Sequence, residues 1–125
     1  MKKYFVTIAL LAIIAACNND VKKEPVAAKP AEDLSANPDY QKGLDLIAKS
    51  NCLTCHKISE KLVGPAYRDV ANKYTADAAT ISMLADKVIK GGTGVWGQIP
   101  MLPHPEISKP DAEQMVKYVL LLKNK

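Results

Sequence analysis

Residues 51–58 read NCLTCHKI. Cys52 and Cys55 stand three positions apart, and His56 follows at once. Three kinds of chemistry can begin in this way: a disulfide or dithiol pair, a metal site, and a covalently attached haem. The rest of the sequence has to decide between them.

The residues around this stretch favour haem. C-x-x-C-H is the attachment signature of c-type haem, because two thioether bonds fix one porphyrin edge and the next residue brings an imidazole to the iron. A thioredoxin-like pair would lie in a βαβ setting, whereas the flanking pattern is helical. A structural zinc site needs four ligands, and beyond Cys52, Cys55 and His56 only His104 is an obvious donor. Zinc and a disulfide remain the alternatives.

The segment 94–103, GVWGQIPMLP, is expected to supply the second iron ligand through Met101. Prolines on both sides make helix and strand unlikely there. A methionine used for packing usually falls on a periodic helical face, as Met83 and Met115 do. Thioether sulfur is a soft ligand, and Met/His ligation raises the haem potential. The alternatives are that Met101 only caps the core, or that His104 is the ligand.

Helical patterns cover most of the remaining domain. Asn37, Pro38 and Asp39 provide an N-cap, a first-position proline and a first-turn acid for a helix that ends at Ser50. Further helices are expected over 67–74, over 81–88 before Gly91-Gly92, and from the capping box-like stretch 108–111 to the C-terminus. No stretch alternates well enough to predict a strand.

This domain has few large residues with which to fill a core. The only phenylalanine is Phe5, close to the N-terminus, and the chain has a single tryptophan. Small domains bury a modest fraction of their surface. We therefore expect a cofactor to fill the middle, and the chain without it to be largely unfolded.

Residues 1–16 have the layout of a secretory signal peptide. Lys2 and Lys3 precede an apolar run over 4–16, YFVTIALLAIIAA, which is too short to span a bilayer comfortably. The run leads directly into Cys17, and IAAC over 14–17 resembles the lipobox of bacterial lipoproteins. This likeness implies cleavage before Cys17 and acylation of that cysteine. An ordinary signal peptide with a chance cysteine, or a folded N-terminal helix, are the alternatives.

The predicted organisation is a signal peptide over 1–16, a flexible tether over 17–36 and a haem domain over 37–125. The tether is rich in Ala, Pro, Lys and Glu, as linkers are. Without Lys2 and Lys3 the chain carries 15 basic and 13 acidic residues. This mild balance, with no basic cluster, does not indicate nucleic-acid binding.

Three segments together resemble a small class I bacterial cytochrome c, of the kind that donates electrons to periplasmic reductases and oxidases. They are CLTCH (52–56), LVGPAYRDVA (62–71) and GVWGQIPM (94–101), and the likeness extends over residues 39–123. It implies an all-α cytochrome c fold, with four or so short helices around one covalently bound haem c. Cys52 and Cys55 would carry the thioethers, and His56 and Met101 would be the axial ligands.

The resemblance also implies roles around the haem. The carbonyl of Pro65 would accept the free ring N–H of His56, and the Trp96 indole would donate to a haem propionate. Relatives often have arginine in place of Lys87, which could contact a propionate only as a point charge. They often have asparagine in place of His104. A histidine there predicts a haem potential that varies between roughly pH 5 and pH 8.

The predicted function is one-electron transfer between periplasmic or membrane respiratory redox partners, without enzymatic activity. A haem with two protein ligands has no open site for a substrate. Lys57, Lys61 and Lys90 could steer an acidic partner, or they could simply be solvated. We expect a monomer that a lipid on Cys17 holds at the periplasmic side of a membrane. The alternatives are a subunit of a larger oxidase or reductase, or a haem enzyme or gas sensor with a displaceable ligand.

Overall fold

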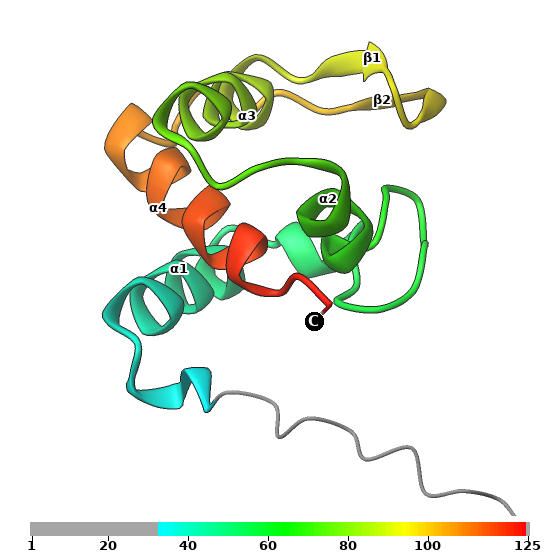
Figure 1. Cartoon of the computed structure of the whole chain (residues 1–125). Coiled ribbons are helices and arrows are strands. Elements are labelled where there is room, and N and C mark those ends of the chain that lie inside the picture. Colours follow the sequence, from blue (N-terminus) through cyan, green and yellow to red (C-terminus); the bar gives the residue numbers. More distant parts are fainter. Residues whose placement is uncertain (1–32, 125) are drawn as a thin grey trace, which may run out of the picture.

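The structure, a computed structural model, describes residues 33–124. The predicted signal peptide, Cys17 and the tether up to residue 32 lie outside the described residues. Within them, the helices are α1 (Pro38–Lys49), α2 (Tyr67–Lys73), α3 (Ala78–Lys90) and α4 (Lys109–Leu121), with 3-10 turns at Leu34–Ala36 and Cys52–Thr54. Two short strands, β1 (Gly92–Gly94) and β2 (Gly97–Met101), stand between α3 and α4 (Figure 1).

The helices α1 and α4 begin at the caps that the sequence predicts. The side-chain oxygen of Asn37 accepts hydrogen bonds from the backbone N–H groups of Asp39 and Tyr40, at 2.9 and 3.1 Å. Ser108 Oγ accepts from the backbone N–H of Asp111 at 3.3 Å and donates to its carboxylate at 2.7 Å. Each cap satisfies N–H groups that have no partner inside the helix.

Helix α3 begins earlier than its apolar pattern suggests. The Asp77 carboxylate accepts from the backbone N–H of Thr80 at 2.8 Å and caps the first turn. At the other end the chain leaves the helix at Gly91, which has φ +65° and donates its N–H to the Lys87 carbonyl at 2.9 Å. This glycine stop is the one that the sequence predicts.

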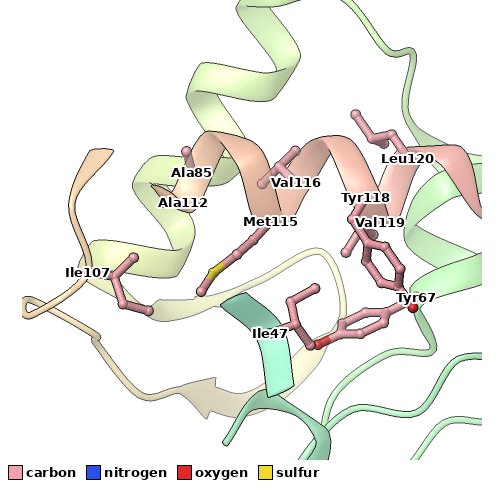
Figure 2. Packing of buried hydrophobic residues seen from close by; sticks show 10 residues of the cluster. All are labelled: Ile47, Tyr67, Ala85, Ile107, Ala112, Met115, Val116, Tyr118, Val119 and Leu120. Atoms are coloured by element: carbon pink, nitrogen blue, oxygen red, sulfur yellow. The ribbon is translucent and has the colours of Figure 1, made fainter. Parts of the chain in front are cut away.

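Helix α4 is the centre of the fold, since α1, α2 and α3 all pack against it (Figure 1). Figure 2 shows side chains of all four helices meeting along it. Tyr118 is 1% exposed and lies between Tyr40 and Tyr67, with ring centroids 4.9 and 6.4 Å away. Burial raises the pKa of Tyr118 to about 12. The buried cluster consists of Ile47, Tyr67, Ala85, Ile107, Ala112, Met115, Val116, Tyr118, Val119 and Leu120.

Two expectations about local structure are wrong. The expected absence of strands fails because β1 and β2 pair antiparallel, with Gly92 opposite Met101 and Gly94 opposite Gly97. The strands are three and five residues long and mostly exposed, so no buried face imposes an alternating pattern. Met83 does not pack in the core either: it is 46% exposed, because the inner face of α3 is formed by other residues, such as Ala85.

The described helices include none that is long and apolar enough to cross a bilayer. The 3-10 turn at Leu34–Ala36 lies against the start of α1, where Gln41 Nε2 donates to the Ser35 carbonyl at 2.5 Å. This turn immediately precedes the predicted start of the domain at residue 37.

Lys109 ties the start of α4 to α3. Its ammonium group donates to the carbonyl of Ser82 and to Asp86 Oδ1, both at 2.6 Å, and the second bond lowers the pKa of Asp86. A carboxylate with a lowered pKa stabilises the fold above its unfolded pKa of about 3.9 and loses that contribution as the pH falls. We expect Lys109→Gln to lower the urea midpoint of the haem-loaded protein at neutral pH and to weaken its acid dependence.

Lys90→Gln is the matched control for this prediction. Lys90 Nζ lies 3.5 Å from the same carboxylate, but both groups are exposed, and surface pairs of this kind contribute little. Equal losses of urea midpoint in the two variants would contradict the role given to Lys109.

Candidate haem site

One apolar pocket brings the C-x-x-C-H stretch and the methionine loop together. Its empty space is about 1050 Å³, part of it open to solvent. Side chains of α1, α2, α3 and α4 form the apolar walls. The predicted site residues that line it are Cys52, His56, Pro65, Lys87, Trp96 and Met101.

The first wall is the turn that follows α1. Asn51 has φ 55°, a left-handed conformation that asparagine tolerates better than most residues, and the chain then forms the 3-10 turn Cys52–Thr54. The Cys52 carbonyl accepts the backbone N–H groups of Cys55 and His56 at 3.2 and 3.0 Å. Cys52 is half-buried at the pocket, where burial raises the pKa of its thiol, and Cys55 is exposed. Both thiols are free.

The His56 imidazole is fixed by a backbone carbonyl. Its Nδ1 lies 2.8 Å from the Pro65 oxygen, so an Nδ1–H donates there. The other nitrogen, Nε2, is then unprotonated and able to bind a metal. This is the contact that the resemblance implies for Pro65.

Gly64 and Tyr67 also hold the imidazole in place. A Cβ added at Gly64 would lie 2.4–2.8 Å from three ring atoms of His56, so the glycine backbone packs directly against the ring. The Tyr67 ring stacks on the imidazole, with centroids 5.2 Å apart and planes 18° apart. Desolvation by burial raises the pKa of Tyr67 well above its usual range. Neither residue is predicted as part of the site from the sequence, because a glycine before proline indicates only a turn and Tyr67 falls on a helical pattern.

The second wall is the β1–β2 hairpin with its loop. Met101 is the last residue of β2, is partly buried, and lines the pocket that His56 lines from the turn after α1. Two candidate ligands, 45 residues apart in the sequence, therefore face one cavity. Only the fold brings them there.

Two basic side chains lie close to the Trp96 side of the pocket. Lys87 Nζ lines the pocket and lies 3.4 Å from the Thr93 carbonyl, while Lys73 Nζ lies 5.8 Å from the centroid of the Trp96 ring. Trp96 itself is 38% exposed. Lys73 was not predicted as a site residue. Its position on α2 becomes relevant because Trp96, which lies between β1 and β2, is close to it.

His104 is not among the residues that line the pocket. Its Nδ1 lies 3.1 Å from Glu106 Oε1. The pKa of Glu106 is lowered by hydrogen bonds from the backbone N–H of Glu106 and from the His104 side chain. A carboxylate therefore lies beside the His104 ring. The structure thus separates His104 from the candidate ligand pair and places it beside an acid.

The predicted pH dependence of the haem potential can be tested at His104 and its neighbour Glu106. We expect His104→Asn to flatten the curve of potential against pH between roughly pH 5 and pH 8, because the variant has no imidazole to protonate. Protein-film voltammetry measures the curve, and Glu106→Gln, which removes the facing charge, should shift it. An unchanged curve in His104→Asn would remove His104 from the explanation.

The donor set fits haem better than the alternatives. Within residues 33–124, no three His, Cys, Asp or Glu side chains are grouped so that they could hold a metal ion, which leaves zinc without a ligand set there. An imidazole and a thioether face one apolar pocket, with two free thiols in the adjoining turn. Imidazole nitrogen and thioether sulfur are among the side-chain groups that ligate haem iron.

Comparison with known proteins places the chain in one family. The family model for cytochrome c matches residues 40–123. Cytochrome c-552 of Nitrosomonas europaea is 43% identical over 83 residues, which cover 66% of this chain and 81% of that protein. Cytochrome c-551 of Allochromatium vinosum is 41% identical over 87 residues, 70% of this chain and 93% of that protein.

The fold agrees with these sequence matches. The crystal structure of Nitrosomonas europaea cytochrome c-552 superposes with a TM-score of 0.60 at 44% identity, covering 64% of this chain and 99% of that one. The family match, the relatives and the pocket geometry lead to the same conclusion. The chain belongs to the cytochrome c family, whose members hold one covalently attached haem and carry electrons.

Proposed function

We propose that this cytochrome c carries single electrons between redox proteins through a haem attached to Cys52 and Cys55 and ligated by His56 and Met101. The observation that carries this proposal is that His56 and Met101 line the same apolar pocket. The thiols of Cys52 and Cys55 lie in the turn just before His56, so covalent attachment and ligation by His56 would involve one short segment.

The residues of the chain have distinct tasks in this proposal. The haem, when bound, supplies an iron that alternates between Fe(II) and Fe(III). Pro65 holds the Nδ1 proton of His56, which keeps Nε2 available and strengthens it as a ligand. Met101 contributes a soft sulfur, which favours the reduced state and raises the potential.

The Trp96 side of the pocket suits the propionates. The indole N–H of Trp96 would donate to a propionate oxygen, and Lys87 would add a positive charge that its bond to the Thr93 carbonyl keeps nearby. Lys73 adds another positive charge beside the indole. Lysine acts as a point charge rather than a bidentate donor, so the indole provides the directional contact.

Electron transfer would follow from the way these two residues hold the haem. His56 and Met101 would hold the iron in both oxidation states, so little of the chain would have to move when an electron arrives or leaves. With both residues bound, the iron would offer no open position to a substrate, and the protein would act as a carrier. The apolar walls limit water in the pocket, and burial of this kind tunes the potential.

We further propose that the domain works at the periplasmic side of a membrane, held by a lipid on Cys17 after removal of residues 1–16. Support comes from the lipobox-like IAAC and from the polar tether that follows it.

Two of the lysines that were expected to steer an acidic partner already form ion pairs within the chain. Lys57 pairs with Glu60 at 3.5 Å, and Lys90 pairs with Asp86 at 3.5 Å. Of the three lysines expected to steer a partner, Lys61 alone has no ion-pair partner among the described residues.

The first experiment is a visible spectrum of the purified protein, oxidised and reduced. We expect a reduced c-type spectrum that survives acid-acetone extraction, together with the red-edge band of a methionine–Fe(III) bond. A c-type spectrum without that band would reject Met101 as the ligand. Labelling with a fatty-acid analogue, compared with a Cys17→Ser variant, tests the anchor separately.

A further inference from the structure

The loop that carries Met101 rests on the C-terminal end of α3. The chain leaves α3 at Gly91, runs through the β1–β2 hairpin and returns, so that residues 101–104 lie against the helix end they came from (Figure 1). Gly91 is therefore in contact with the segment that follows β2. From the sequence, this glycine is predicted only to end the helix.

The contact at Gly91 leaves no room for a side chain. A Cβ at this position would lie 2.4 Å from the Met101 carbonyl oxygen, 2.7 Å from the Pro103 nitrogen and 2.9 Å from the Leu102 carbonyl carbon. All three are backbone atoms, so no side-chain rotation can relieve the overlap. An added Cβ would have to push the loop away from the helix.

Hydrogen bonds hold the same loop on the helix end. The backbone N–H of His104 donates to the carbonyls of Val88 at 3.2 Å and Ile89 at 3.0 Å. These carbonyls belong to the last turn of α3, where no further helical N–H is available. On the other side, Met101 is paired with Gly92 across the hairpin. The backbone around Met101 is thus held by the last turn of α3 on one side and by Gly92 on the other.

We propose that Gly91 is a positioning residue for the iron ligand. Because Gly91 has no Cβ, the Met101–His104 loop can pack directly on the end of α3. This packing determines how far the Met101 sulfur reaches into the pocket. The inference rests on the proposed ligation by Met101. The strength of that ligation then depends on Gly91, which follows α3 and is not among the residues that line the pocket.

The test compares Gly91→Ala with Gly43→Ala in the haem-loaded protein. A Cβ at Gly43 would lie 2.4 Å from Tyr118 Cβ and 2.7 Å from the Gln114 carbonyl oxygen, so both variants overpack the chain. They differ in place, because Gly43 is buried on α1 and is not among the residues that line the pocket. Overpacking is common to the two variants, and displacement of the Met101 loop belongs only to Gly91→Ala.

We expect Gly91→Ala to lose most of the methionine–Fe(III) band, and its reduced form to bind carbon monoxide at least about tenfold more tightly than the unmodified protein. Gly43→Ala should keep the band and change that affinity by less than about threefold. Urea unfolding measured alongside separates a lost ligand from a general loss of stability. A retained band in Gly91→Ala, or loss of the band in both variants, would overturn the proposal.

A second pair of variants decides the matter if Gly91→Ala does not yield haem-loaded protein. His104→Pro removes the donor to Val88 and Ile89 and puts a ring carbon in its place, whereas His104→Ala keeps the backbone N–H. We expect the band to weaken only in His104→Pro, and retention of the full band there would reject the proposal. Absence of the band from the unmodified protein would reject ligation by Met101 itself, so the two failures are distinguishable.

Discussion

Replacing Met101 with alanine is expected to abolish the methionine–Fe(III) band and to open one axial position to external ligands. The reduced variant should bind carbon monoxide, and its reduction potential should fall by on the order of 0.1 V or more, since axial ligands set haem potentials over roughly 0.8 V. The c-type spectrum itself should persist, because Cys52, Cys55 and His56 are unchanged. Redox titration and ligand-binding spectra measure both effects.

Met83→Ala is the matched control for this result. Met83 is 46% exposed on α3, so its replacement removes a thioether without affecting the pocket. Its band and potential should equal those of the unmodified protein. A Met101→Ala protein that kept the red-edge band would mean that another sulfur reaches the iron, and the carrier mechanism would need a different ligand.

Replacing Gly64 with alanine is expected to displace the His56 imidazole. The added Cβ would lie 2.4–2.8 Å from Cε1, Nδ1 and Nε2 of the ring, which the Pro65 carbonyl and the Tyr67 ring hold in place. Overpacking of this kind costs about 1–3 kcal/mol of unfolding free energy. We also expect altered proton NMR shifts of the haem methyls in the oxidised protein, because they report the orientation of the axial imidazole.

Gly43→Ala provides an equally crowded control. Its Cβ would lie 2.4 Å from Tyr118 Cβ and 2.7 Å from the Gln114 carbonyl, where α1 crosses α4. This variant should lose a comparable amount of stability and keep the haem methyl shifts of the unmodified protein. Identical shifts in Gly64→Ala would show that Gly64 contributes to packing alone and does not orient the ligand.

The haem cofactor of this protein can be predicted from its sequence. Attachment of haem depends on two thiols and an imidazole at fixed spacing, and residues 52–56 state that spacing directly. Helix starts are equally local: Asn37 and Ser108 cap helices through N–H groups two or three residues away. Interactions of this short range are legible in a single sequence because the chain itself fixes the partners.

The residues that position His56 and Met101 are brought to them by contacts between distant segments of the chain, which the sequence does not show. The stack of Tyr67 on His56 and the contact of Gly64 with the same ring depend on how the loop before α2 folds back. The hairpin was not predicted because its short, exposed strands carry no buried face. Gly91 reads as a helix stop in the sequence, and its contact with the Met101 loop exists only because the chain returns to the end of α3. A glycine's sequence context shows that the chain can turn there, but the segment that approaches it is set by packing between distant parts of the chain.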